Sequence, residues 1–356
     1  MTDGARPTPH LRLLLTLAAF AFGAGIAAVR VRYGAADFDV FWAAARHWQA
    51  PYDPQVIADL KAQLHIVGHW PFAYPPTFLL FAWPFGQLPL NIAYPLWAGL
   101  SMALFILASS FMIRPTWATA LLFLTPPVVF AVAPGQSTLL VGAAAIGGFL
   151  LLEKRPRLAG VLFAVAACIK PQAMILAPVV LWGRWPTVTA AMVTGLALVA
   201  LSCVFGPRLW LQWPGALAGF SGIMDTTNRI NPSALIDSPL WAVPLAAFGV
   251  YLAWTSRNLL GLIGGAMCCT PYAHDYDFAP LAPLAVVWVL GRKNLGWSFM
   301  IAGGVFLSGL PRSPALVLAF LIAVALIQSP WWPWRAGKEQ GAPVSRSPFS
   351  ETETAA

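Results

Sequence analysis

The chain has 356 residues, of which 59% are hydrophobic and only 10% are charged, and its mean hydropathy is +0.70. Such a composition excludes a soluble globular enzyme, a disordered chain and a collagen-like fibre. The net charge is +8, but Lys and Arg lie in short segments between long apolar blocks rather than in a basic stripe, which excludes nucleic-acid binding. We therefore predict an all-α, polytopic integral membrane protein with about 11 to 13 transmembrane helices.

The first apolar run covers residues 13–29 and follows a short basic segment. It is longer than the apolar core of most signal peptides, and further apolar segments follow, so we expect an uncleaved first span. The next stretch, 30–76, is rich in polar residues and is predicted to be an external loop with a short helix at about 38–49. Segment 77–90 is interrupted by Pro84 and is expected to be re-entrant or interfacial.

The rest of the chain alternates between apolar segments and polar connections. We expect apolar helices at 91–113, 115–133, 136–152, 158–169, 171–183, 187–206, 239–255, 258–271, 275–290, 295–310 and 314–329. Segments 158–169 and 171–183 are too short to cross a hydrocarbon core of about 30 Å, so we expect half-helices or a broken pair there. Residues 207–238 are predicted to form a second external loop. Residues 1–335 are expected to form one membrane domain, followed by a disordered cytoplasmic tail at 336–356.

The distribution of charge predicts the orientation. If 77–90 does not span, the Lys and Arg of the short connections and of the tail all lie on the side of the N-terminus, which the positive-inside rule assigns to the cytoplasm. Eight of the thirteen carboxylates then lie on the opposite side. We therefore expect a multi-pass protein of the plasma (inner) membrane, with both termini in the cytoplasm and its polar chemistry on the external face.

The first candidate for chemistry is the sequence Asp37-Phe38-Asp39, just beyond the first span. A carboxylate beside aromatic residues at the membrane interface can have a raised pKa and act as a general base. The alternative is structural, because Asp37 precedes an Ala-rich segment and can cap its helix. Asp39 stays open as the active carboxylate.

The second candidate is Lys170, which interrupts an apolar run in the sequence Ile169-Lys170-Pro171. A Lys within the membrane costs a few kcal/mol unless it is paired or lines a wet cavity. An ammonium group there suits a phosphate or a carboxylate, and Pro171 would break the helix beside it. The alternative is a Lys that snorkels from the end of an ordinary span.

A third cluster occupies residues 270–277. His274 can hydrogen-bond an oxyanion or shuttle a proton, and Asp275 or Asp277 can orient it. The two carboxylates can instead cap the helix that begins near residue 278.

Three weaker candidates lie in loops. Tyr74, before Pro75-Pro76, and Gln136, after Gly135, would shape the external face, where Gln136 can bind a sugar or simply belong to a turn. Arg229, in the second external loop, can bind a phosphate.

No metal or nucleotide site is indicated. The four cysteines lie in apolar segments without C-x-x-C spacing, which predicts neither a zinc site nor a disulfide framework. The chain has no Walker loop, no G-x-G-x-x-G sequence and no H-E-x-x-H sequence. We therefore expect no cofactor and no metal, and a donor or cargo that resides in the membrane.

The motifs follow one another in a distinctive order between about residues 30 and 290. They are Asp37-Phe38 with Phe41-Trp42 and Ala43-Ala44, Pro51-Tyr52-Asp53-Pro54, Tyr74-Pro75-Pro76, Gly135-Gln136, Leu158-Ala159-Gly160, Ile169-Lys170-Pro171, and Pro271-Tyr272 with His274 and Asp277. This series resembles the polyprenol-phosphate-sugar-dependent glycosyltransferases of family 87. That family belongs to the multi-span glycosyltransferase C superfamily and includes phosphatidylinositol mannoside mannosyltransferases.

The resemblance implies that a hexose, expected to be mannose, moves with inversion from a polyprenyl-phosphate donor to a hydroxyl of a lipid or glycan acceptor. It implies that Asp37 is the general base, that Lys170 binds the donor phosphate and that His274 lies beside it. No metal is required. The predicted site comprises the catalytic carboxylates Asp37 and Asp39, the phosphate-binding Lys170, His274 and Arg229, and the substrate-binding Tyr74, Gln136, Tyr272 and Asp277.

Two other classes of function stay open from the residues alone. A transporter or flippase of lipid-linked or polar cargo would also have broken helices and an intramembrane Lys. The short, basic inner connections and the lack of an internal repeat disfavour it. A non-catalytic subunit of an envelope-polysaccharide assembly would tolerate Asp37→Asn, which the enzyme should not.

Overall fold

The computed structural model describes residues 9–33, 37–63, 71–113, 116–223, 239–270 and 273–291, together with 318–319 and 321–322. These residues form helices, 3₁₀ turns and connecting segments, with no β-strand among them, so the predicted all-α class is confirmed. Within this part of the chain, three helices are long and apolar enough to cross a membrane, and shorter apolar helices accompany them. The predicted helices at 295–310 and 314–329 and the predicted tail lie almost entirely outside the described residues, so the number of spans stays a prediction.

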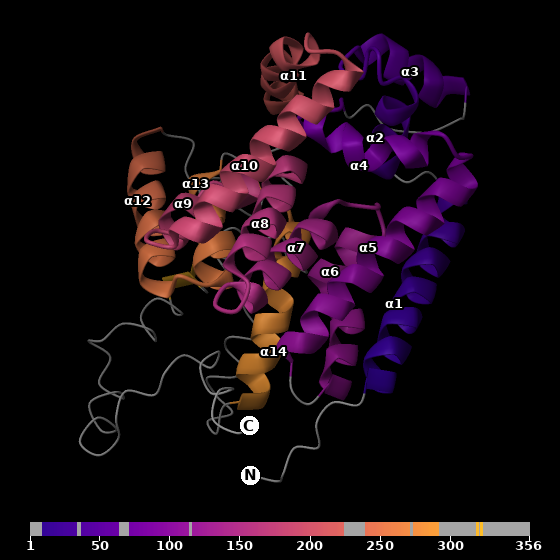
Figure 1. Ribbon diagram of the computed structural model, residues 1–356. Coiled ribbons are helices and arrows are strands. Elements are labelled where there is room, and N and C mark those ends of the chain that lie inside the picture. The colour runs from indigo at the N-terminus through magenta and orange to yellow at the C-terminus, as the bar shows by residue number, and fades with distance from the viewer. Residues whose placement is uncertain are drawn as a thin grey trace, which may run out of the picture.

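The first half of the chain contains two long helices with shorter elements between and after them (Figure 1). The elements are α1 (Pro9–Arg30), η1 (Val31–Tyr33), α2 (Phe38–Arg46), α3 (Pro54–Gln63), η2 (Pro76–Phe78), α4 (Leu79–Gly86), α5 (Leu90–Met112), η3 (Thr116–Leu124), α6 (Pro126–Val132) and α7 (Thr138–Leu151).

The second half contains more interruptions. Its elements are α8 (Pro156–Ile169), η4 (Pro171–Met174), α9 (Ala177–Val180), α10 (Trp185–Ser202), η5 (Cys203–Phe205), α11 (Leu209–Ile223), α12 (Pro239–Ser256), η8 (Leu260–Gly264), α13 (Gly265–Cys269), η9 (Asp275–Leu281) and α14 (Ala282–Gly291).

Helices α1 and α5 lie side by side along one edge of the molecule (Figure 1). The buried residues of α1 are Ala19, Gly23 and Ala27, which repeat every four residues and therefore share one face. A Cβ atom at Gly23 would lie only 2.6 Å from the carbonyl oxygen of Ala98 on α5. In lipid, where the hydrophobic effect does not bring helices together, such small residues permit the close backbone approach that provides packing energy.

Short helices surround the centre of the molecule. Helices α7 and α8 have 14 residues each, about 21 Å at 1.5 Å per residue, which is less than the thickness of a hydrocarbon core. Helix α8 ends before Pro171. The segment between α8 and α10 contains the 3₁₀ turn η4 and the one-turn helix α9. The prediction of short, broken helices at 158–169 and 171–183 is thus confirmed.

The structure differs from the expected elements in three places. The predicted loop 207–238 begins with the helix α11, because its first part carries no charged residue after Arg208 and is apolar enough to be helical. The polar stretch 30–76 contains a second helix, α3, after the expected one. The expected helix 115–133 is split at Thr125, because Pro126 begins a new helix.

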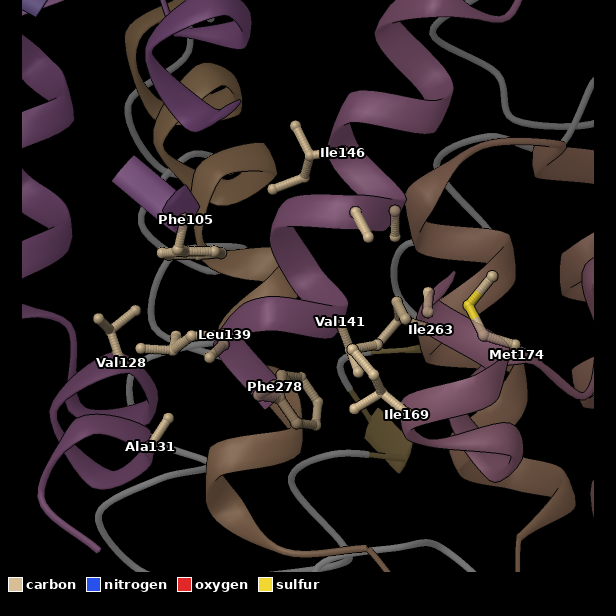
Figure 2. Packing of buried hydrophobic residues seen from close by; sticks show 14 of the residues in the cluster. Phe105, Val128, Ala131, Leu139, Val141, Ile146, Ile169, Met174, Ile263 and Phe278 are labelled. Atoms are coloured by element: carbon tan, nitrogen blue, oxygen red, sulfur yellow. The ribbon is translucent and has the colours of Figure 1, made fainter. Parts of the chain in front are cut away.

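The hydrophobic core is centred on α7. Figure 2 shows Leu139, Val141 and Ile146 of this helix among side chains from neighbouring elements. These neighbours are Phe105 of α5, Val128 and Ala131 of α6, Ile169 of α8, Met174 of η4, Ile263 of η8 and Phe278 of η9, all of them buried. Three of these core residues are direct neighbours of polar residues in the sequence. Leu139 follows Thr138, Ile169 precedes Lys170, and Phe278 follows Asp277. Packing of the core therefore fixes the backbone on which those polar side chains are carried.

Candidate functional site

Lys170 lies at the end of α8 and is 4% exposed. Its Nζ atom forms an ion pair with the carboxylate of Asp277 and donates a hydrogen bond of 3.2 Å to Thr138 Oγ1. A snorkelling Lys would have an accessible ammonium group, so burial excludes that interpretation. The cation is instead held at a helix break by a carboxylate, as an intramembrane charge requires.

Asp277 connects three elements through its two carboxylate oxygens. Oδ1 accepts from Lys170 and, at 3.2 Å, from Thr138 Oγ1. Oδ2 accepts from the backbone N–H of His274 at 3.0 Å, and in return the His274 side chain accepts from the backbone N–H of Asp277. Asp277 therefore does cap the helical turn η9, as one alternative held, and it also pairs with the buried cation.

One aromatic ring, that of Tyr276, lies close to both His274 and Lys170. The imidazole ring of His274 lies 5.1 Å from the ring centroid of Tyr276, and Lys170 Nζ lies 5.2 Å from that centroid. Both basic side chains are therefore close to the ring of Tyr276, and a cation near the negative face of an aromatic ring is stabilised electrostatically.

Tyr74 occupies the centre of a second group of polar contacts. Its hydroxyl donates to Gln136 Oε1 at 3.3 Å and accepts from Ser137 Oγ at 3.1 Å. Burial raises the pKa of its phenol above the ordinary value, and the nearby carboxylates of Asp37 and Asp277 raise that pKa further. The phenol therefore stays protonated and acts as a hydrogen-bond donor rather than as a base.

The turn before α7 positions the start of α2. Gly135 has φ +74°, and a Cβ atom there would lie 2.7 Å from Phe38 Cβ and 2.8 Å from Tyr94 Cε2. The backbone N–H of Phe38 donates to Pro134 O at 2.9 Å, and Trp97 Nε1 donates to Gly135 O at 2.8 Å. Glycine is needed here for both the left-handed conformation and the close approach. The turn thereby fixes the start of α2, where Asp37 is the residue before Phe38.

Asp37 is the residue at the N-cap position of α2, yet its side chain makes no capping hydrogen bond. The capping interpretation is therefore not supported by the geometry. The side chain is half-buried, and its carboxylate acts electrostatically on the hydroxyls of Tyr74 and Tyr276. Asp37 thus precedes the residue, Phe38, whose backbone N–H binds the turn that also carries Gln136.

Asp39 belongs to a different face of α2. Two positions along an α-helix correspond to a rotation of about 200°, so Asp37 and Asp39 project to nearly opposite sides. Asp39 is 1% exposed, whereas Asp37 is half-buried. The other two predicted site residues, Arg229 and Tyr272, lie outside the described residues.

Three residues near this site were not singled out by their sequence pattern, namely Thr138, Ser137 and Tyr276. Ser137 and Thr138 have a detectable signal, because they are polar residues at the start of an otherwise apolar segment. Tyr276 lies within a recognised motif but has no distinguishing feature of its own. Within the described part of the chain, no three His, Cys, Asp or Glu side chains come together as metal ligands. That the reaction needs no metal stays a prediction.

The fold and this site define a class of protein. It is a helical membrane protein that has interrupted helices and a buried cation paired with a carboxylate. A model of glycosyltransferase family 87 matches residues 72–314. The match covers more than half of the chain, so the protein belongs to glycosyltransferase family 87, and the predicted family is confirmed. Searches of curated proteins and of solved structures found no match. The matched range includes Lys170, His274 and Asp277 but begins after Asp37.

Proposed function

We propose that this membrane glycosyltransferase moves a hexose, most simply mannose, from a polyprenyl-phosphate donor to an acceptor hydroxyl on the external membrane face. In this reaction the acceptor oxygen attacks the anomeric carbon, the bond from that carbon to the phosphate oxygen breaks, and the configuration inverts. The acceptor proton passes to Asp37, and polyprenyl phosphate leaves. The observation that carries the proposal is the buried ammonium group of Lys170, which Asp277 and Thr138 orient in a chain of glycosyltransferase family 87.

Lys170 is assigned to the leaving phosphate. Negative charge develops on the phosphate oxygens as the bond breaks, and a cation already fixed in a dry environment stabilises that charge most effectively. Asp277 and Thr138 orient the ammonium group before the donor arrives. A cavity of about 30 Å³, lined in part by Lys170, Thr138 and Asp277, adjoins it. This is room for about one water molecule, so the donor phosphate must widen the space and share Lys170 with Asp277.

Asp37 is preferred to Asp39 as the base because of position. A general base must come within hydrogen-bond reach of the acceptor hydroxyl. Asp37 is half-buried at the start of α2, whereas Asp39 is enclosed on another face of this helix. An inverting displacement needs the base and the phosphate-binding cation on opposite sides of the sugar, and the proposal gives these two roles to Asp37 and Lys170.

The transporter alternative has less support. The broken helices and the intramembrane Lys170 are equally compatible with transport. Membership of a glycosyltransferase family accounts for the same features through an enzyme. We therefore assign the buried charge pair to catalysis.

The test uses the purified full-length protein with radiolabelled polyprenyl-phosphate mannose and a total lipid extract as acceptor. We expect label in a new lipid with the wild type and a loss of at least about 100-fold with Asp37→Asn, the usual contribution of a general base. Asp39→Asn is the matched control and should keep its transfer rate if it remains folded, as measured by its thermal unfolding. Equal transfer by wild type and Asp37→Asn would reject Asp37 as the base.

A further inference from the structure

A cavity of about 840 Å³ lies between the connection from α2 to α3 and the helix α11. One wall includes Tyr52, Asp53 and Phe72, and the other is one face of α11 that includes Gly215 and Gly219. Figure 1 shows α3 and α11 next to each other at the top of the molecule. The volume is within the range of about 300–1,000 Å³ that is typical of sites for small organic ligands.

The lining combines aromatic rings with amide groups and one carboxylate, that of Asp53. The polar and aromatic members are Gln49, Asp53, Gln55, Gln212, Tyr52, Phe72 and Phe220. Amide groups can donate hydrogen bonds to hydroxyls and accept them from hydroxyls, an ionised carboxylate can accept them, and aromatic rings can cover the apolar faces of a sugar. None of the described lining residues is Lys, Arg or His, so a phosphate or carboxylate ligand would find no opposite charge there.

The cavity adjoins the proposed catalytic site through Tyr74. The hydroxyl of Tyr52, in the cavity wall, donates to the carbonyl oxygen of Tyr74 at 2.8 Å. The ring of Phe72, also in the wall, is stacked on that of Tyr74 with centroids 5.9 Å apart. Tyr74 in turn lies within the electrostatic influence of Asp37. The wall of the cavity therefore contacts Tyr74 of the proposed site through both a hydrogen bond and a ring contact.

We infer that this cavity binds a neutral saccharide, which is the sugar portion of the acceptor. The acceptor is then a glycan or glycolipid that bears no phosphate or carboxylate on the sugars that meet this wall. Its role as an acceptor site rests on the proposed function, whereas saccharide binding by itself does not.

The two glycines of α11 allow the cavity to be filled without disturbing its walls. A Cβ atom at Gly215 or Gly219 would meet no atom within 4 Å. A Leu at either position extends into the cavity, and Leu favours a helix more than Gly does. Gly195 of α10 is the matched control, because it is equally open and does not line the cavity.

The first measurement is saturation-transfer NMR on the full-length protein in nanodiscs with mannotriose as the neutral probe. We expect transfer from the wild type and from Gly195→Leu, and its loss with Gly215→Leu and Gly219→Leu. Trigalacturonic acid, an acidic trisaccharide, should give a weaker signal. The inference is overturned if the wild type gives no signal with mannotriose or if both cavity-filling variants keep it.

The second measurement separates this inference from the proposed function. In the transfer assay, Gly215→Leu should reduce kcat/KM for the acceptor by at least about tenfold, while slow hydrolysis of the donor in the absence of acceptor stays at the wild-type rate. Saccharide binding by a protein that neither transfers nor hydrolyses would reject the proposed function and keep the binding site. Full acceptor transfer by Gly215→Leu would reject the acceptor role.

Discussion

At the scale of single residues, Lys170 and Asp277 form a buried ion pair in which each charge compensates the other. Lys170 is almost fully buried and its charge is balanced by Asp277. Asp277 also accepts from the backbone N–H of His274, so the carboxylate fixes both basic residues relative to one helical turn. Breaking such a pair costs more than replacing it, because the remaining charge stays buried.

The first prediction concerns this pair. Asp277→Asn keeps a side chain that can cap η9, but it leaves the Lys170 ammonium without a counter-charge. We expect it to lower the free energy of unfolding by about 3–5 kcal/mol, measured by unfolding in detergent.

The double variant Lys170→Met with Asp277→Asn has no buried charge and should recover much of that loss. If the effects of the two substitutions simply add, the ion pair contributes no coupling energy and the interpretation is wrong.

At the scale of elements, short helices and turns determine where the chemical groups lie. The turn at Gly135 sets the distance between α7 and the start of α2, and Pro171 ends α8 beside Lys170. Neither feature can be replaced by an uninterrupted helix without moving a polar side chain of the site.

The second prediction concerns the turn. Gly135→Ala places a methyl group against Phe38 and Tyr94 at a residue with positive φ, so it should displace the start of α2 and reduce transfer. Gly183 also has positive φ but open space around it, so Gly183→Ala should cost only the backbone strain of about 1–2 kcal/mol. Transfer rates and thermal unfolding of both variants provide the comparison. Equal effects would show that the contact with α2 is unimportant.

The third prediction concerns the packing of α1 on α5. Gly23→Val forces the backbones apart at Ala98 and should lower the free energy of unfolding by about 1–3 kcal/mol. Gly25 of the same helix faces open space, so Gly25→Val should have little effect. Thermal unfolding in detergent measures both. A similar loss for the two variants would contradict the assignment of the Gly23 face to this interface.

At the scale of the whole molecule, polar chemistry is concentrated where distant parts of the sequence meet. Helices α2, α3 and α11 lie together at the top of the molecule in Figure 1, and the central short helices lie beneath them. The candidate site draws Asp37 from the start of α2, Tyr74 from a loop, Lys170 from the end of α8 and Asp277 from η9. A buried site in a membrane protein needs such convergence, because one helix rarely supplies both the charge and its counter-charge.

Much of this was predictable from the sequence. The apolar composition determines a helical membrane protein, because unsatisfied backbone groups cannot face lipid. Proline residues marked the interrupted helices, and the order of the motifs indicated the family. Lys170 was recognisable as a candidate site residue because a charge within an apolar run is costly. These properties are local or compositional, so they can be recognised without knowing which helices are neighbours.

Tertiary structure decided the rest, because it depends on contacts between residues far apart in the chain. The pairing of Lys170 with Asp277 joins residues 107 positions apart, and no sequence spacing specifies it. Only the packing of α2 against the Gly135 turn distinguishes Asp37 from Asp39, which look equivalent as neighbouring carboxylates. The cavity beside α11 likewise depends on tertiary structure, because its walls come from α11 and from the distant connection between α2 and α3. The sequence by itself determined which chemical groups the protein has, and helix packing determined which of them meet.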